Sequence, residues 1–380
     1  MIDLQYDNPL RRQVMSLPQL MRDLYAELEP ASRAVLSTPE IFGIQRIVMT
    51  GCGDSFAAIL ATKDAFEKLT KIRVEAVQTV DLARLYDQRL LGFAPNNPLV
   101  IAISNSGQVA RIGEAVERCN KHGAFTLAVT GNEESPLGRA AQRIYKLTVP
   151  KTESAPGTRT YMGSVLALYL LAIRIAEVRG KITMDVARSH RKDILAHADA
   201  LEALLPAMDE TALRLAKDWK DFPGFDFLGS GMDYAAAWFG HAKVLEAIGR
   251  YAMYVSTEEW LHLNFFLRNA SQTGTMIFAT KSNPAHSRTL ETIGYAKQLG
   301  RPMAVVTDCD PAEIGEGVNC FIVPKTKHDY AMALSQWTPV CLLMGYIQLM
   351  LGEKSGRGCE GPWSFSKGAA CVRQSEIVVL

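Results

Sequence analysis

The 380-residue sequence lacks the cysteine spacing and the long apolar runs that mark several common classes of protein. Its 7 cysteines are scattered, and none forms a C-x-x-C pair, which argues against a disulfide scaffold or a structural metal site. The apolar stretches 161–173 and 339–351 are too short to span a bilayer and are expected to be buried helices. The N-terminus lacks the apolar core of a signal peptide. We therefore expect a cytoplasmic protein with reduced thiols, no metal and no membrane partner.

The sequence also lacks an excess of charge of either sign. It has 41 Lys and Arg against 40 Asp and Glu, a net charge of +1, and no block of basic residues. This balance argues against a nucleic-acid partner, but it leaves room for a local site that binds a small anion. The composition, with 48% hydrophobic residues, is typical of soluble proteins, and the length suits two domains.

What the sequence does contain is an internal repeat. Four segments of the first half recur in the same order in the second half, at an offset of about 177 residues. Each is a short aliphatic run followed by a polar turn or loop. The pairs are 46–69 with 225–248, 99–112 with 275–290, 125–141 with 302–317, and 145–150 with 320–324. A repeat of this kind indicates a duplicated domain.

The alternation of buried strands with amphipathic helices predicts the α/β class, with a doubly wound parallel sheet in each half. We expect helices to precede the first half, to connect the halves, and a tail to follow. The expected boundaries are 1–40 for the N-terminal helical segment, 41–180 for the first domain, 181–220 for the helical connection, 221–355 for the second domain, and 356–380 for the tail.

The stretch "IAISNSGQV" runs a buried strand into three small polar residues and a glycine. In an open α/β sheet, ligands bind beyond the carboxyl ends of the strands, where helix N-termini offer free N–H groups to an anion. Ser104, Asn105 and Ser106 would add hydroxyl and amide groups to a phosphate cradle. The same residue types are also preferred as plain helix caps, so the tetrapeptide alone leaves both interpretations open. The second half has "KSNP" at this place.

Two Gly-x-Gly turns, at 51–53 and 229–231, could suggest a dinucleotide site. The pattern G-x-G-x-x-G fails in both, because Phe56 and Tyr234 occupy the last position. We therefore expect no nicotinamide and no other cofactor. Ser55 begins the helix after the first of these turns, where it could reach the anion crevice or simply cap the helix.

The densest group of candidate catalytic residues lies between 239 and 262. Lys243 and Glu246 are three residues apart, so they share one helical face, where they could form a proton-carrying site or an ordinary surface ion pair. His262 follows two acidic residues in "STEEWLH". A single histidine of this kind is also commonly packed or solvated.

The repeat and the "SNSG" turn resemble the double sugar-isomerase (SIS) family, typified by the isomerase half of glucosamine-6-phosphate synthase. The resemblance covers residues 40–380 and implies tandem flavodoxin-like SIS domains. The family's S-[QN]-S-G-[ED]-T resembles "SNSGQV", which implies that Ser104, Asn105 and Ser106 bind phosphate. The family's C-G-T-S resembles "CGDS" and adds Ser55. Its E-x-x-V-A-S-T-K resembles "ESAPGTRT" and places Thr158 at a substrate-contacting position.

In the second half, the family's K-x-K-E helix and the histidine sixteen residues later resemble "KVLE" and "EEWLH". This implies that Glu246 moves a proton between C1 and C2 and that His262 opens the sugar ring. The family's C-terminal lysine matches Lys367, and Lys243 or Lys367 would offset charge on the carbonyl oxygen. In the family the histidine comes from the neighbouring subunit, which implies a homodimer. Leu-Asn follows the histidine where the family has Gly-Pro, and Val109 replaces a threonine in the phosphate loop.

The sequence begins without an N-terminal nucleophilic cysteine or a glutaminase domain, so we expect no glutamine hydrolysis. The resemblance then points to an isomerase-type enzyme acting on a sugar phosphate: a 6-phosphorylated amino sugar, with release of ammonia, or a fructosamine phosphate, with release of an amine. The sequence does not separate the two. The alternative is a regulatory SIS protein that binds sugar phosphates without catalysis. No basic helical module precedes residue 40, and the Glu–His pair is present, which favours an enzyme.

Overall fold

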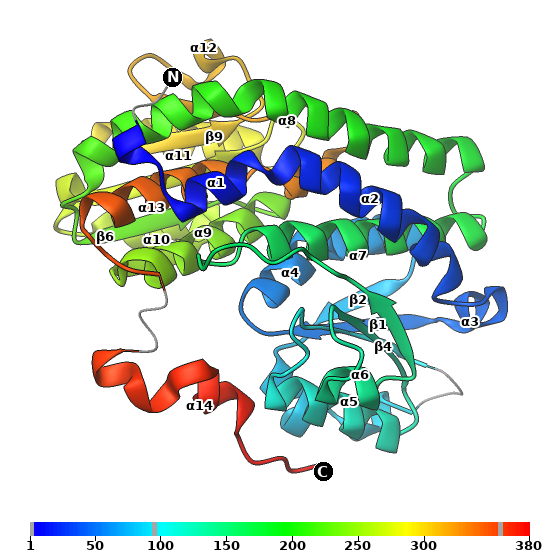
Figure 1. The fold of residues 1–380 in the computed structure, drawn as a ribbon. Coiled ribbons are helices and arrows are strands. Elements are labelled where there is room, and N and C mark those ends of the chain that lie inside the picture. Colours follow the sequence, from blue (N-terminus) through cyan, green and yellow to red (C-terminus); the bar gives the residue numbers. More distant parts are fainter. Residues whose placement is uncertain (1–3, 93–96, 356–359) are drawn as a thin grey trace. The chain divides into compact units, whose positions relative to one another are not determined.

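The computed structural model describes residues 4–92, 97–355 and 360–380, which fall into two compact units with one sheet each (Figure 1). The first-sheet unit comprises residues 21–151, 160–192 and 360–380. The second-sheet unit comprises residues 4–20, 152–159 and 193–355. The units therefore interleave along the chain, because the N-terminal residues belong with the second sheet and the tail with the first.

The first sheet has five parallel strands in the order β2-β1-β3-β4-β5. Its strands are β1 (Arg46–Gly51), β2 (Arg73–Ala76), β3 (Leu99–Ile103), β4 (Phe125–Thr130) and β5 (Arg143–Lys146). Every residue of β3 and β4 is buried, as expected for central strands of a parallel sheet covered on both faces. The helices of this part are α2 (Leu17–Ala34), α3 (Thr38–Gly43), α4 (Asp54–Thr70), α5 (Ala110–Lys121), α6 (Pro136–Ala140), α7 (Arg159–Val178) and α14 (Ala370–Arg373).

The second sheet has the order β10-β9-β8-β6-β7, again with all strands parallel. Its strands are β6 (Gly224–Leu228), β7 (Tyr251–Val255), β8 (Thr273–Ala279), β9 (Met303–Thr307) and β10 (Asn319–Ile322). The helices of this part are α1 (Pro9–Met15), α8 (Met184–Trp219), α9 (Met232–Ile248), α10 (Thr257–His262), α11 (His286–Gln298), α12 (Pro311–Ile314) and α13 (Thr338–Met350). Counted along the chain, both sheets have the doubly wound order 2-1-3-4-5, so the predicted fold class and repeat are confirmed.

The repeat extends to details of the backbone. Gly53 and Gly231 precede α4 and α9 with nearly the same dihedral angles, φ 56° and ψ −129° against φ 58° and ψ −124°. The two expected apolar helices are present as α7 and α13. α7 is long and apolar enough to cross a membrane, yet 83% of its most apolar window is buried inside the protein, and the central residues of α13 are buried as well. Burial in a protein core accounts for the apolar character of both helices.

Candidate functional site

In the first-sheet unit, the polar turn after β3 folds back on itself. Ser104 is only 5% exposed, and its hydroxyl accepts a hydrogen bond from the Gly107 amide (3.1 Å). The Ser106 hydroxyl accepts a hydrogen bond from the Gln108 amide (3.3 Å). Helix α5 begins only after Val109, and its N-terminus has no side-chain cap hydrogen bond. Ser104, Asn105 and Ser106 therefore do not cap α5, and the first turn of this helix keeps the N–H character that suits an anion.

Ser55 lies beside this turn because of a close approach at Gly51. A Cβ atom at Gly51 would lie 2.9 Å from the Ser55 Cβ and 3.2 Å from the Ile103 carbonyl oxygen. The first turn of α4 and the end of β3 thus meet at the same glycine. This is the point between β1 and β3 where the strand order reverses, which is where doubly wound sheets bind ligands. The structure therefore places Ser55 next to the turn that holds Ser104 and Ser106.

Gly107 is required by the packing of this turn. Its φ is +64°, and a Cβ atom there would collide with the Ser135 side chain. We expect Gly107→Ala to destabilise the protein by about 2 kcal/mol, through left-handed strain and overpacking. Calorimetric unfolding measures the loss, and inorganic phosphate binding should weaken with it. Gly113→Ala, with its nearest neighbour 3.6 Å away, is the matched control, and equal stability of the two variants would contradict the assignment.

The second half has a buried carboxylate near the corresponding turn. Asp233 lies two residues after Gly231, as Ser55 lies two after Gly53, and is 1% exposed. It accepts hydrogen bonds from the Thr280 hydroxyl (2.6 Å), the Thr280 amide (3.1 Å) and the Asn283 amide group (2.9 Å), while burial raises the pKa of its carboxyl. The turn after β8 is thus bonded to an internal acid, whereas the described hydrogen bonds of the serine turn in the first half involve no such acid.

In the second-sheet unit, α9 carries the two residues predicted to act together. The Lys243 ammonium lies 2.6 Å from a Glu246 carboxylate oxygen, 3.1 Å from the Gly157 carbonyl oxygen and 4.5 Å from the centre of the Phe239 ring. The Lys243 side chain is completely buried, whereas that of Glu246 is 41% exposed. The pair is therefore not a solvated surface ion pair. A buried cation orients a carboxylate that still reaches solvent, which is an arrangement suited to proton transfer.

The segment 152–159 brings Thr158 and Gly157 to this unit. Thr158 is fully buried, and its hydroxyl donates a hydrogen bond to the Gln13 side-chain oxygen. The only proton of this hydroxyl is therefore committed within the protein, and contact of Thr158 with a substrate stays a prediction. Sequence reasoning did not find Gln13 or the Gly157 carbonyl, because their partners lie 145 and 86 residues away and leave no local pattern.

The remaining two predicted residues lie on exposed segments. His262 ends α10 with a side chain that is 66% exposed and 3.4 Å from Glu258. Arg288 donates a hydrogen bond to Glu258 (2.7 Å) and holds the pKa of that carboxyl below its usual value. Lys367 is exposed in the 3-10 segment Gly361–Ala369, at a residue with non-helical dihedral angles. The structure thus brings Lys243 to Glu246 and Ser55 to the serine turn, while His262 and Lys367 face solvent.

The tail that carries Lys367 is attached to α5, the helix that follows the serine turn. The Arg111 guanidinium donates to the Glu376 carbonyl oxygen (2.9 Å), and the Glu114 carboxylate accepts from the Val378 amide (2.8 Å). The adjacent Arg84 also donates to Glu114, which lowers the pKa of this buried carboxyl against the effect of its burial. The last residues of the chain are therefore fixed to the same unit as the serine turn.

A pocket of about 490 Å³ opens at the carboxyl ends of β6 and β7. Two tyrosines, two serines and one acid are among its lining residues: Tyr234, Tyr254, Ser230, Ser256 and Glu259. Within the described parts of the chain, no three His, Cys, Asp or Glu residues gather as metal ligands would.

The doubly wound repeat and the serine turn are the features that carry the resemblance to SIS proteins, and comparison with known proteins agrees. Residues 40–174 match the family model described as SIS domain. The glutamine–fructose-6-phosphate aminotransferase (isomerizing) of Clostridium tetani is 25% identical over 355 residues, 91% of this chain and 57% of the relative. That of Helicobacter pylori is 29% identical over 245 residues, 64% of this chain and 40% of the relative. The chain spans about half the length of these relatives.

Solved structures agree on the fold. The C-terminal domain of glucosamine-fructose-6-phosphate aminotransferase from Francisella tularensis superposes with a TM-score of 0.81 at 15% identity, covering 93% of this chain and 99% of that chain. Tagatose-6-phosphate ketose/aldose isomerase from Escherichia coli superposes with a TM-score of 0.75 at 18% identity, covering 96% of this chain and 100% of that chain. Glucosamine-6-phosphate deaminase from Thermotoga maritima superposes with a TM-score of 0.65 at 18% identity, covering 91% of this chain and 96% of that chain. The predicted resemblance to SIS proteins is confirmed by the family model, and these solved structures share the fold of the chain.

Proposed function

We propose that the protein is a cytoplasmic enzyme that acts on a 6-phosphorylated amino sugar or a fructosamine 6-phosphate and releases the amine. The observation that carries this proposal is the Lys243–Glu246 pair, in which a completely buried ammonium holds a half-exposed carboxylate at 2.6 Å. A non-catalytic sugar-phosphate sensor has no need for a carboxylate oriented in this way. The names of the relatives, which include aminotransferases, isomerases and a deaminase, support the same class of substrate.

Both reactions follow from one proton transfer by Glu246. With an open-chain amino sugar, the carboxylate takes the proton from C2 and returns it to C1 through an enolamine. The product carries an imine at C2, which water hydrolyses to a ketone and ammonia. With a fructosamine, the proton moves from C1 to C2, and water hydrolyses the imine at C1 to an aldose phosphate and the free amine. In each case Lys243 offsets negative charge on the carbonyl oxygen of the sugar or on the Glu246 carboxylate.

The phosphate would be held by the first half of the chain. Ser55, Ser104, Asn105 and Ser106 are the proposed ligands, together with the N-terminus of α5, which has no side-chain cap. Thr158 is a further proposed contact and would have to exchange its bond to Gln13 for one to the substrate. Binding a phosphate far from C1 and C2 supplies energy that positions the reacting carbons.

The proposal includes a homodimer in which His262 serves the site of the neighbouring subunit. His262 is 66% exposed at the end of α10, as a residue offered to another chain would be. It would protonate the ring oxygen and open the sugar, and Lys367 would close over the substrate as part of the tail. The tail is proposed to serve as a lid on the active site. The expected domain boundaries stay predictions, and the compact units differ from them in grouping residues 4–20 and 152–159 with the second sheet.

The experiment that tests this function is an incubation of the purified protein with three substrates in parallel. Glucosamine 6-phosphate, a fructosamine 6-phosphate and fructose 6-phosphate are supplied separately, and free ammonia, free amine and hexose phosphate are followed. Ammonia from the first substrate identifies a deaminase, amine from the second a deglycase, and aldose phosphate from the third a plain isomerase. Binding of a substrate without turnover of any of them would overturn the enzyme and establish the sensor instead.

A further inference from the structure

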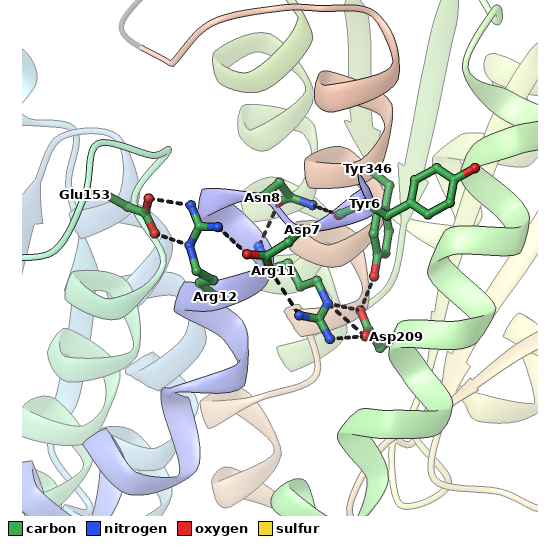
Figure 2. A network of polar contacts seen from close by, with 8 residues as sticks. All are labelled: Tyr6, Asp7, Asn8, Arg11, Arg12, Glu153, Asp209 and Tyr346. Atoms are coloured by element: carbon green, nitrogen blue, oxygen red, sulfur yellow. Dashed lines mark hydrogen bonds and ion pairs between the residues drawn. The ribbon is translucent and has the colours of Figure 1, made fainter. Parts of the chain in front are cut away.

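The N-terminal helix α1 is bonded to the segment that reaches Lys243. The Arg12 guanidinium donates two hydrogen bonds to the Glu153 carboxylate, at 2.6 and 2.5 Å (Figure 2). The Gln13 amide group donates to the Glu153 carbonyl oxygen at 3.1 Å. Side chain and backbone of Glu153 are therefore both fixed by neighbouring residues of one helix.

The same helix fixes the other end of the segment. The side-chain oxygen of Gln13 accepts a hydrogen bond from the Thr158 hydroxyl. The Gln13 side chain therefore binds residue 153 through its nitrogen and residue 158 through its oxygen. Gln13 is 7% exposed and Thr158 is fully buried, so water does not compete for these bonds. The Arg159 guanidinium adds a bond to the Ser16 hydroxyl at 3.0 Å.

Helix α1 is in turn anchored to two other helices of its unit. The Arg11 guanidinium pairs with Asp209 of α8 at 2.8 Å, and the Tyr346 hydroxyl of α13 donates to the same carboxylate at 2.5 Å (Figure 2). Asp209 has only 3% of its side chain exposed, which makes this a buried anchor. The contacts to Asp209 involve α8 and α13, whereas Arg12 and Gln13 hold the segment 152–159.

The segment passes this constraint on to the proposed catalytic pair. The Gly157 carbonyl oxygen, next to Thr158, accepts a hydrogen bond from the Lys243 ammonium, which also binds Glu246. A lysine ammonium is a point charge on a flexible stem, so its direction depends on the acceptors around it. A displaced Gly157 carbonyl would therefore turn the ammonium and, with it, the carboxylate.

We propose that Gln13 is a positioning residue for the active site, acting through Thr158 and the Gly157 carbonyl on the Lys243–Glu246 pair. This inference rests on the proposed function of Glu246. Gln13 touches neither reacting residue, and its effect is on geometry. Because a displacement of about 1 Å can lower a rate up to about 100-fold, loss of its two bonds should reduce kcat about tenfold.

The test compares Gln13→Met, which keeps the volume and removes both hydrogen bonds, with Tyr346→Phe, which loosens the anchor on Asp209. We expect Gln13→Met to lower kcat about tenfold with KM within about twofold, because the proposed phosphate ligands Ser104 and Ser106 are unchanged. Tyr346→Phe should lower the melting temperature but leave kcat unchanged, because the Arg11–Asp209 ion pair still holds α1.

A second readout does not depend on turnover. Acetylation of Lys243 by an anhydride, followed by peptide mass spectrometry, should be several-fold faster in Gln13→Met than in the wild type and unchanged in Tyr346→Phe. Unaltered acetylation in Gln13→Met would overturn the inference, as would an equal fall in kcat for Tyr346→Phe. Full activity of a Glu246→Gln variant would instead overturn the proposed function, and Lys243 acetylation would still decide the role of Gln13.

Discussion

Replacing Glu246 by glutamine is expected to lower kcat about 10³-fold, because general acid–base catalysis by one group contributes about 10²–10⁴-fold. The amide cannot accept the proton that the reaction moves. Its oxygen can still accept the hydrogen bond from Lys243 that the carboxylate accepts at 2.6 Å, so the fold should be preserved. Steady-state turnover of whichever sugar phosphate reacts measures the loss, and the melting temperature should change little.

Glu117→Gln is the matched control for this variant. Glu117 is also an exposed glutamate on a helix that follows a strand, but it lies in α5, outside the Lys243–Glu246 pair and the residues that line the pocket. Its substitution should leave kcat within about threefold, since surface substitutions outside a site have small effects. Retention of kcat by Glu246→Gln at the control's level would remove Glu246 from the mechanism and leave the protein as a binder.

The fold could be predicted because its signals are local and occur twice. A buried aliphatic run, a glycine turn and an amphipathic helix each leave a pattern within about 20 residues, and the second copy repeats it. The matching dihedral angles of Gly53 and Gly231 show that even the turn before each helix was preserved after duplication. Parallel strands with short connections then leave few possible topologies.

The site could be predicted only in part, because its two determining contacts are not local. The spacing of Lys243 and Glu246 predicts that they are neighbours, but it does not predict that one is buried and the other half-exposed. The Lys243 ammonium also bonds the Gly157 carbonyl oxygen, which lies 86 residues away, so no local pattern predicts this contact. The pairing of Asp233 with Thr280 is equally invisible, since a buried carboxylate bonded across a turn resembles an ordinary helix-starting acid in the sequence.

Replacing Lys243 by methionine is expected to lower kcat about 10²–10³-fold, the range found when one preorganised electrostatic partner is removed. Methionine keeps most of the apolar stem that lies against Phe239 but provides no ammonium for Glu246 or for the Gly157 carbonyl. The acid limb of the pH–rate profile should move to higher pH, because the carboxylate loses the cation that favours its charged form. A rate profile between pH 4 and pH 9 measures both effects.

Lys220→Met is the matched control, because it removes another lysine–carboxylate contact outside the proposed site. The Lys220 ammonium lies 2.6 Å from Asp221, the same distance as in the Lys243–Glu246 pair, but both side chains of the Lys220–Asp221 pair are exposed. An exposed pair contributes little, so this variant should keep the wild-type kcat and pH profile. If Lys243→Met lowered the melting temperature but left kcat and the acid limb unchanged, Lys243 would be a packing residue only. Glu246 would then have to be oriented by groups other than the ammonium, and the role assigned to Gln13 would fail with it.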